Sequence, residues 1–219
     1  SCNRYNADDS KSAGNKKEQK TKAAWDYDKE IKKLVKFYSV RFETHQNSLK
    51  ISSGKMRKDM CNVIDHFLRE ESYSFSETEL GFLKNAVETS ITCRRVLMNS
   101  YGLVFFLENS EKKTLFEFSQ AELEHHTELL TGKLENIIRK VTAQTTIGKA
   151  PQPNASATAA LQLEVDSVFN QEERMTIMNL EKAVKNSLES LCEQVRDDSF
   201  YATSSATNAA IFKQREEAP

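Results

Sequence analysis

The chain has 219 residues, of which 38% are hydrophobic and 29% charged, and its mean hydropathy is −0.62. At about 150 residues per domain, this length accommodates one domain with appendages or two small domains. Only six Gly and three Pro occur, and no Pro precedes Pro151, which disfavours β-rich and loop-rich folds. The longest apolar run, Leu103 to Leu107, is far shorter than the ~20 residues of a membrane span. We therefore expect an all-α protein without membrane contact.

Four cysteines occur singly in the chain, namely Cys2, Cys61, Cys93 and Cys192. Structural zinc sites usually draw on ligand pairs a few residues apart, and disulfide scaffolds are short and rich in cysteine. We therefore expect a reducing compartment, the cytoplasm with the nucleus as a further location. Cys61 and Cys93 fall within amphipathic helices and are expected to pack in the core. His45 and His66 stand among apolar neighbours, which indicates partial burial.

Charge is unevenly distributed along the chain. Residues 1–58 contain 15 Lys and Arg against 7 Asp and Glu, whereas the remainder contains 16 against 25. One interpretation is a basic adaptor that binds nucleic acid or an acidic protein surface, supported by Lys32, Lys33 and Lys36 beside Phe37 and Tyr38. The other is that the two halves of the chain pack on each other. No helix-turn-helix or RNA-binding motif accompanies the lysines, so nucleic acid is the weaker interpretation.

Hydrophobic periodicity predicts the first three helices. The first spans about Thr21 to Ser52 and carries an apolar stripe at Ile31, Leu34, Val35, Tyr38, Phe42 and Leu49. Gly54 predicts a break, after which a second helix of about four turns runs from Met56 to Phe67. A capping box of Ser76 and Glu79 starts the third helix, which continues to Leu107 and is expected to be buried on all sides from Tyr101 onward.

A second capping box, Thr114 with Glu117, predicts the start of a fourth helix through Ile138. From 142 to 160 the composition shifts to Thr, Ala, Gln, Asn, Ser, Gly and Pro, which is typical of a flexible linker. A narrow apolar seam then steps by three and four residues from Ile177 to Val195, which favours a C-terminal helix that packs on the preceding ones. We predict an elongated bundle of four to five helices with a flexible linker and a disordered tail.

One constellation has metal-ligand spacing. Glu122 and His125 form an E-x-x-H that places a carboxylate and an imidazole on one helix face, but a dinuclear helical site needs two such motifs. A solvated polar face is therefore the preferred interpretation, with a metal-dependent helical enzyme as the alternative. Phosphate-binding loops and Ser-His-Asp patterns are absent from the sequence.

Several blocks resemble the C-terminal part of ariadne-type RING-between-RING ubiquitin ligases, in order and approximate spacing. They are Cys2-Asn3-Arg4-Tyr5-Asn6 with Asp8-Asp9; Phe37-Tyr38 with Asn47-Ser48-Leu49; Phe82-Leu83-Lys84-Asn85-Ala86-Val87; Cys93-Arg94; Leu97-Met98; and Phe116-Glu117 with Gln120-Ala121-Glu122-Leu123-Glu124. The similarity covers about Cys2 to Ile138 and is greatest to the animal ariadne-one type. It implies the end of the catalytic RING-like module with a linker (1–20), followed by an Ariadne helical domain (21–140). Composition and periodicity add a flexible linker (141–160), a C-terminal helix that packs on the domain (161–198) and a disordered tail (199–219).

The resemblance implies a regulatory function. In this family the helical domain folds back on the catalytic module and occludes its cysteine until a neddylated cullin-RING ligase releases it. The implied partners are that catalytic module, a ubiquitin-conjugating enzyme bound by the parent protein, and the cullin complex. Cys2 would be the last zinc ligand of the catalytic module; the family's catalytic cysteine precedes this motif, so the chain is expected to hold no catalytic residue and no cofactor of its own.

The resemblance also implies an inhibitory interface. It assigns Glu117 and Glu128 to that interface, although Glu117 as capping partner of Thr114 and Glu128 as a surface charge are the alternatives. The family's aromatic-acidic pair is replaced here by Ile51-Ser52, which removes an aromatic anchor and a charge. Ser48, near this pair, is a candidate regulatory site because a phosphate would add up to about two negative charges there.

Overall fold

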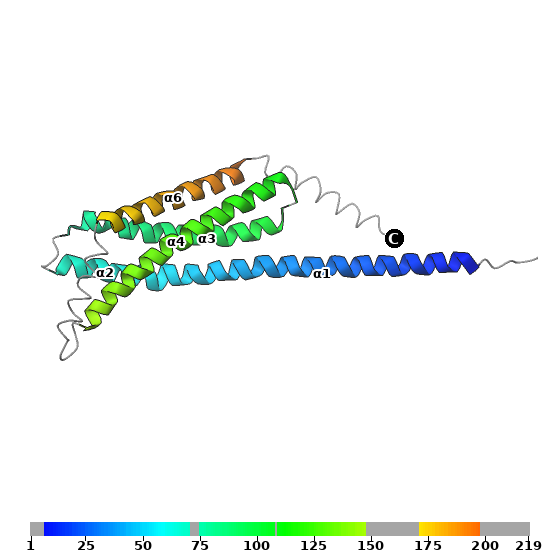
Figure 1. Cartoon of the computed structure of the whole chain (residues 1–219), viewed down its shortest axis with the longest axis horizontal. Helices are drawn as coiled ribbons and strands as arrows, with labels where there is room; N and C mark the ends of the chain where they lie inside the picture. The colour runs from blue at the N-terminus through cyan, green and yellow to red at the C-terminus, as the bar shows by residue number, and fades with distance from the viewer. Residues whose placement is uncertain (1–6, 71–74, 108, 148–170, 198–219) are drawn as a thin grey trace, which may run out of the picture.

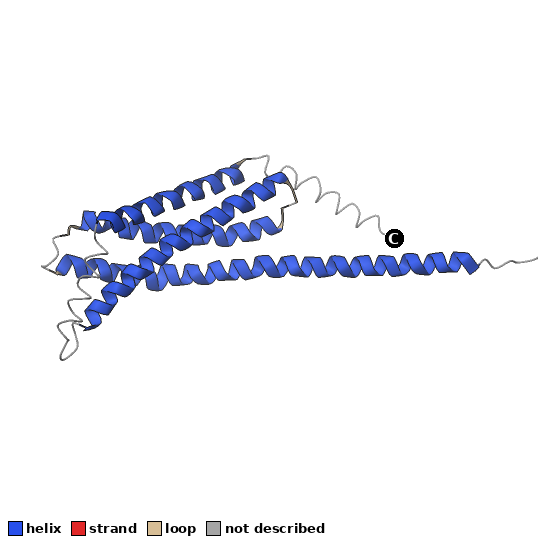
Figure 2. Ribbon diagram, in the orientation of Figure 1, coloured by secondary structure: helices blue, strands red, loops and turns tan. Residues whose placement is uncertain are grey.

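All regular structure in the described part of the chain is helical. The computed structural model describes residues 7–70, 75–107, 109–147 and 171–197; the side chains of 7–27 and 144–147 are outside that description. The described helices are α1 (Ala7–Ile51), α2 (Arg57–Arg69), α3 (Glu77–Phe105), α4 (Glu111–Ile147) and α6 (Gln171–Arg196) (Figure 1). A short π-helix, η1 (Ser52–Met56), connects α1 to α2. Figure 2 shows the same uniformly helical architecture. The all-α prediction is confirmed.

The first two helices form one continuous rod, with no break at Gly54 (Figure 1). Ile51 and Arg57, which flank η1, both have right-handed helical backbone angles (φ −65°, ψ −48° and φ −58°, ψ −47°). A single Gly lowers helix stability by only about 1 kcal/mol relative to Ala, and one wide turn of π-helix is a known way to continue a helix. Ser52 and Met56, both buried, hold this turn against the bundle. The predicted break was therefore wrong, and α1 also begins earlier than Thr21.

Helix α3 is the centre of the bundle, with α1, α2, α4 and α6 packed around it. Its start is the predicted capping box: the Ser76 hydroxyl accepts from the Glu79 amide at 3.3 Å, and the Glu79 carboxylate accepts from the Ser76 amide at 2.9 Å. Buried apolar residues along α3 include Leu80, Leu83, Val87, Ile91, Leu97 and Val104. The third helix start is therefore confirmed at the level of individual hydrogen bonds.

Ser76→Ala is expected to lower the free energy of unfolding by about 1 kcal/mol, because the first turn of α3 loses one of its amide acceptors. The capping bonds are exposed, so no packing change should accompany the substitution. Urea unfolding followed by circular dichroism measures this difference. Ser76→Asp is the matched control, since aspartate is an equally good cap. A loss as large in the aspartate variant would contradict a capping role.

Helix α4 differs from its predicted boundaries at both ends. It begins at Glu111, where the Lys113 amide donates to the Ser110 hydroxyl at 3.2 Å. The predicted capping box at Thr114 is therefore wrong; Thr114 lies inside the helix and donates to the Ser110 carbonyl. At the other end α4 continues to Ile147 because buried Val141 extends its apolar stripe. Residues 141–147 of the predicted linker are therefore helical, whereas 148–160 and the predicted tail 199–219 lie outside the described residues.

The C-terminal helix α6 runs antiparallel to α4. Three contacts fix the register: Lys133 with Glu173 at 3.0 Å, His126 with Ser187 at 2.9 Å, and Ser119 with Gln194 at 2.7 Å. The seam of α6 faces α3 and α4, with Ile177, Val184 and Leu191 at most 1% exposed. Glu181, also on the inner side, accepts from the Thr89 hydroxyl of α3 at 3.2 Å.

Some expected burial does not occur. Ile31, Leu34 and Val35 are 37%, 49% and 45% exposed, so this part of the apolar stripe of α1 is only partly covered. Figure 1 shows that the N-terminal part of α1 extends beyond the other helices. Phe106, which follows the last turn of α3, is 74% exposed, so the region after Tyr101 is not buried on all sides. Cys61 is exposed, contrary to prediction. The buried position of Cys93 and the partial burial of His66 are confirmed.

Candidate functional site

A groove runs along one side of the bundle, between the rod α1–η1–α2 and helix α4. Both walls pack on α3, which lies beneath them. The groove is defined by three separate cavities between these elements, of about 630, 190 and 780 Å³. The first lies between the Phe37–Arg41 turn of α1 and the start of α4, the second beside Ser48 and Ser52, and the third beside η1 and the last turns of α4. We call this feature the α1/α4 groove.

Four glutamates of α4 face this groove: Glu117, Glu124, Glu128 and Glu135. Their separations of seven, four and seven residues keep them on one side of a helix with 3.6 residues per turn. The two glutamates that the family resemblance assigns to an interface, Glu117 and Glu128, therefore lie about 16 Å apart along one face of α4, at 1.5 Å per residue. Each of the first three glutamates meets a different partner, and these partners determine what each carboxylate can do.

Glu117 bonds to α1 across the groove. The Tyr38 hydroxyl donates to its Oε1 at 2.9 Å, and the Tyr38 ring stands edge-on to Phe105 with 6.0 Å between centroids. Burial and the Glu117 carboxylate together raise the pKa of Tyr38 to about 12, so the phenol stays protonated and remains a donor. Because Thr114 does not cap the helix, Glu117 has no capping role; its carboxylate lines the groove and accepts the hydrogen bond from Tyr38.

Glu124 belongs to a buried polar cluster that sequence reasoning missed. The Tyr101 hydroxyl donates to Glu124 Oε2 at 2.6 Å, and His45 Nε2 lies 3.3 Å from Oε1, close enough for an ion pair but not aligned as a hydrogen bond. The His45 ring, only 1% exposed, stacks on Tyr101 with centroids 5.4 Å apart and an angle of 13°. This cluster ties α1, α3 and α4 together beneath the middle of the groove.

Stability is expected to fall with acid through the titration of Glu124. The adjacent His45 imidazole contributes most, and the Tyr101 hydroxyl adds to it, in lowering the pKa of Glu124 from 4.5 to about 2 against the opposing effect of burial. A depressed folded-state pKa gives stability that is present above about 4.5 and is lost as the pH falls toward about 2. Unfolding free energies of wild type and Glu124→Gln should therefore converge through this window. A constant difference between them would contradict this assignment.

Glu128 is held from below by a buried arginine. Arg94 of α3, 2% exposed, donates from Nη1 to Oε1 at 2.6 Å and from Nη2 to Oε2 at 2.9 Å. This two-bond pairing lowers the pKa of Glu128, whose side chain is 56% exposed. Arg94 was not among the predicted site residues, although one signal could have identified it: a charged residue three positions from both Ile91 and Leu97 on a buried stripe.

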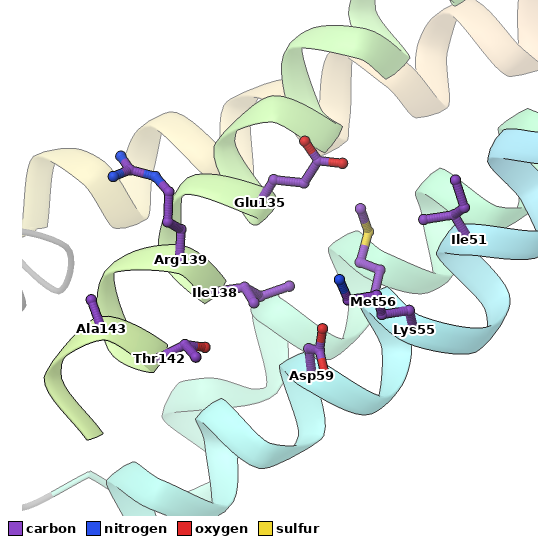
Figure 3. A pocket seen from close by; sticks show the side chains of 9 residues that line it. All are labelled: Ile51, Lys55, Met56, Asp59, Glu135, Ile138, Arg139, Thr142 and Ala143. Carbon is purple, nitrogen blue, oxygen red and sulfur yellow. The ribbon is translucent and has the colours of Figure 1, made fainter. Parts of the chain in front are cut away.

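The divergent pair Ile51-Ser52 separates in the structure. Ile51 is 55% exposed and lines both the 190 Å³ and the 780 Å³ cavities, whereas Ser52 is 2% exposed and lies below the surface. Figure 3 shows Ile138 and Glu135 of α4 directed toward Met56 of η1, while Arg139 points away. The groove at this end therefore has an aliphatic floor with charged edges. Ser52 also lines the 190 Å³ cavity, so Ile51 is the more accessible of the two residues but not the only one beside the groove.

The other predicted site residues have mixed placements. Ser48 is half-buried and lines the 190 Å³ cavity together with Glu128 and Glu135. Cys2 lies outside the described residues. Among the residues that the structure describes, no three His, Cys, Asp or Glu side chains gather closely enough to hold a metal ion, and the E-x-x-H gains no third ligand there.

The structure also bears on two other features considered from the sequence, the lysines of α1 and membrane-spanning helices. Lys32 and Lys33 pair with Asp28 and Glu30 of their own helix at 2.6 and 2.7 Å, as expected for an ordinary solvated face. Within the described ranges, no helix combines the length and hydropathy that a membrane span requires.

Comparison with known proteins finds relatives of part of this chain. No family model matches the chain. It is 34% identical over 143 residues to the E3 ubiquitin-protein ligase ARIH1 of Homo sapiens and to arih1 of Xenopus tropicalis, and 33% identical over 135 residues to ari-1.1 of Caenorhabditis elegans. The chain is a relative of the ariadne-type E3 ubiquitin-protein ligases.

The match to the ariadne ligases covers 65% of this chain but only 24–25% of the vertebrate relatives. The chain thus spans about a quarter of the length of the curated relatives it matches. The matched part is their C-terminal region, which confirms the resemblance to an ariadne RING-between-RING ligase.

Proposed function

We propose that this chain is the autoinhibitory domain of an ariadne-type E3 ubiquitin ligase. It covers the catalytic cysteine of the parent enzyme until a neddylated cullin-RING ligase releases it. One observation carries the proposal: in a relative of these ligases, Glu117 and Glu128 face the same groove from one side of α4. A partner surface that bridges the groove can therefore meet both carboxylates at once.

The composition of the groove favours a folded protein partner. Its floor includes aliphatic Met56 and Ile138, exposed Ile51 supplies an anchor at the edge, and carboxylates line α4. Apolar contact surrounded by polar groups is the usual anatomy of a reversible protein interface. The loss of an aromatic residue at Ile51 predicts a weaker clamp than in relatives that retain it, because aromatic side chains contribute disproportionately to interfaces.

Release of the catalytic cysteine is a shift in population from the closed to the open state of the parent ligase. The parent ligase supplies the catalytic module and the ubiquitin-conjugating enzyme, and the cullin complex binds only the open arrangement. To change an enzyme from about 1% to about 99% open, the activator must favour the open state about 10⁴-fold. Removing a groove contact lowers this requirement, and so destabilising the closed state raises basal ubiquitin transfer.

The test adds the purified chain in trans to the catalytic part of an ariadne ligase that lacks its own C-terminal domain, and follows ubiquitin transfer from the conjugating enzyme. We expect saturable inhibition, weakened by Glu117→Ala and Ile51→Asp. The matched control is Glu189→Ala on the exposed side of α6. Absence of inhibition by the folded chain, or equal weakening by the control, would contradict the proposal.

A phosphate at Ser48 is expected to weaken inhibition. The hydroxyl lies in the cavity that also contains Glu128 and Glu135, so added negative charge meets two carboxylates. Ser48→Glu should raise the inhibition constant in the same trans assay, whereas Ser48→Ala should leave it near the wild-type value. Equal inhibition by Ser48→Glu and wild type would remove Ser48 from the regulatory surface.

A further inference from the structure

The Arg94–Glu128 pair is built asymmetrically. Arg94 comes from the central helix and is 2% exposed, whereas the Glu128 side chain is 56% exposed on the wall of the groove. Both terminal nitrogens of the guanidinium bond to the carboxylate, at 2.6 and 2.9 Å. Two parallel hydrogen bonds from a planar donor fix the plane as well as the position of a carboxylate.

Stability alone does not account for a guanidinium at this depth. The Arg94 Nε is buried and has no hydrogen-bond partner among the described residues. Buried ion pairs seldom add net stability over apolar side chains of similar volume, because desolvation offsets the attraction. An arginine that is buried with an unsatisfied nitrogen is better explained by the orientation it imposes on its partner.

The carboxylate of Glu128 keeps free acceptor capacity. Its two oxygens offer about four lone-pair positions, and Arg94 uses one on each oxygen. The remaining lone-pair positions are accessible to a partner, because the Glu128 side chain is half exposed beside the 190 Å³ cavity. Because Arg94 compensates its charge, Glu128 suits a neutral donor, such as a backbone amide, a hydroxyl or a side-chain amide, better than a lysine.

We propose that Arg94 is a positioning residue of the inhibitory surface, which holds the Glu128 carboxylate as a fixed acceptor for a neutral hydrogen-bond donor of the catalytic module. This inference rests on the proposed function. It differs from a surface-charge role for Glu128 in two consequences. The contribution of Glu128 to inhibition depends on Arg94, and it changes little with salt concentration, since a neutral donor is not screened as a charge is.

The experiment is a double-mutant cycle in the trans inhibition assay, with Arg94→Met, Glu128→Gln and the combined variant. Arg94→Met is expected to raise the inhibition constant about tenfold, and to add little once Glu128 is already Gln. Arg94→Lys, which can donate a hydrogen bond without the planar fork, should fall between wild type and Arg94→Met. Arg57→Met is the matched control, because Arg57 pairs with Glu88 away from the groove.

The outcomes separate the two proposals. Unchanged inhibition by folded Arg94→Met, or an undiminished tenfold effect in the Glu128→Gln background, would overturn the positioning role. Stronger inhibition by Arg94→Met would also overturn it, since Arg94 would then be withholding Glu128 from the partner. If Arg94→Met fails to fold, wild-type inhibition by Arg94→Lys with unaltered salt dependence contradicts the need for the fork. Failure of the wild-type chain to inhibit refutes the proposed function itself.

Discussion

Glu128→Ala is expected to lower the free energy of unfolding by about 3 kcal/mol, whereas Arg94→Met should lower it by less than about 1.5 kcal/mol. The difference arises from burial. Removing Glu128 leaves the guanidinium of Arg94, 2% exposed, without its counter-charge. Removing Arg94 leaves a carboxylate whose side chain is 56% exposed and can be hydrated. Urea unfolding of both variants at neutral pH measures the asymmetry.

The combined variant is the control for this prediction. With both charges removed, no buried ion remains unpaired, so Arg94→Met/Glu128→Ala should be more stable than Glu128→Ala alone. Additive losses in the double variant would contradict a coupled pair. The result also bears on tests of function, because a strong effect of Glu128→Ala on ubiquitin transfer combines lost contacts with lost stability. Glu128→Gln avoids this complication by keeping an acceptor for Arg94.

Leu97→Ala is expected to destabilise the chain by about 3 kcal/mol, within the usual range for a fully buried leucine. Leu97 is 0% exposed on α3, the helix against which the others pack, so little collapse can fill the cavity. The measurement is again the free energy of unfolding in urea. Leu68→Ala on α2 is the matched control, since Leu68 is 41% exposed and should lose less than about 1 kcal/mol. Equal losses for the two leucines would contradict the placement of the core.

The presence of each helix could be predicted from the local hydrophobic pattern. The residue at which a helix begins or ends depended on which of several nearby residues caps it and on tertiary contacts. The capping box at Ser76 formed as predicted because the residues that complete it are three positions apart. Thr114 and Glu117 have the same spacing, yet Ser110 starts the helix earlier and leaves Thr114 inside. Gly54 does not end a helix, because buried Ser52 and Met56 on either side stabilise a continuous rod. Sequence spacing does not encode such tertiary contacts.

The candidate site was likewise predictable only in part. The placement of Glu117 and Glu128 on one helix face follows from their spacing of eleven residues, close to three turns. Their partners do not, since Tyr38 lies 79 residues from Glu117, and Arg94 lies 34 residues from Glu128. His45 and Tyr101 meet Glu124 only because three helices converge. Charged or polar residues on a buried stripe are the sequence signal that such a cluster leaves.

Occlusion of the catalytic cysteine is the central claim, and its alkylation rate tests that claim most directly. The measurement follows the reaction of that cysteine, in the catalytic part of an ariadne ligase, with iodoacetamide as the purified chain is titrated in. We predict a saturable decrease in rate, and weaker protection by Glu117→Ala and by Arg94→Met. An unchanged alkylation rate while the chain is demonstrably bound would contradict occlusion and would mean that the α1/α4 groove engages another surface.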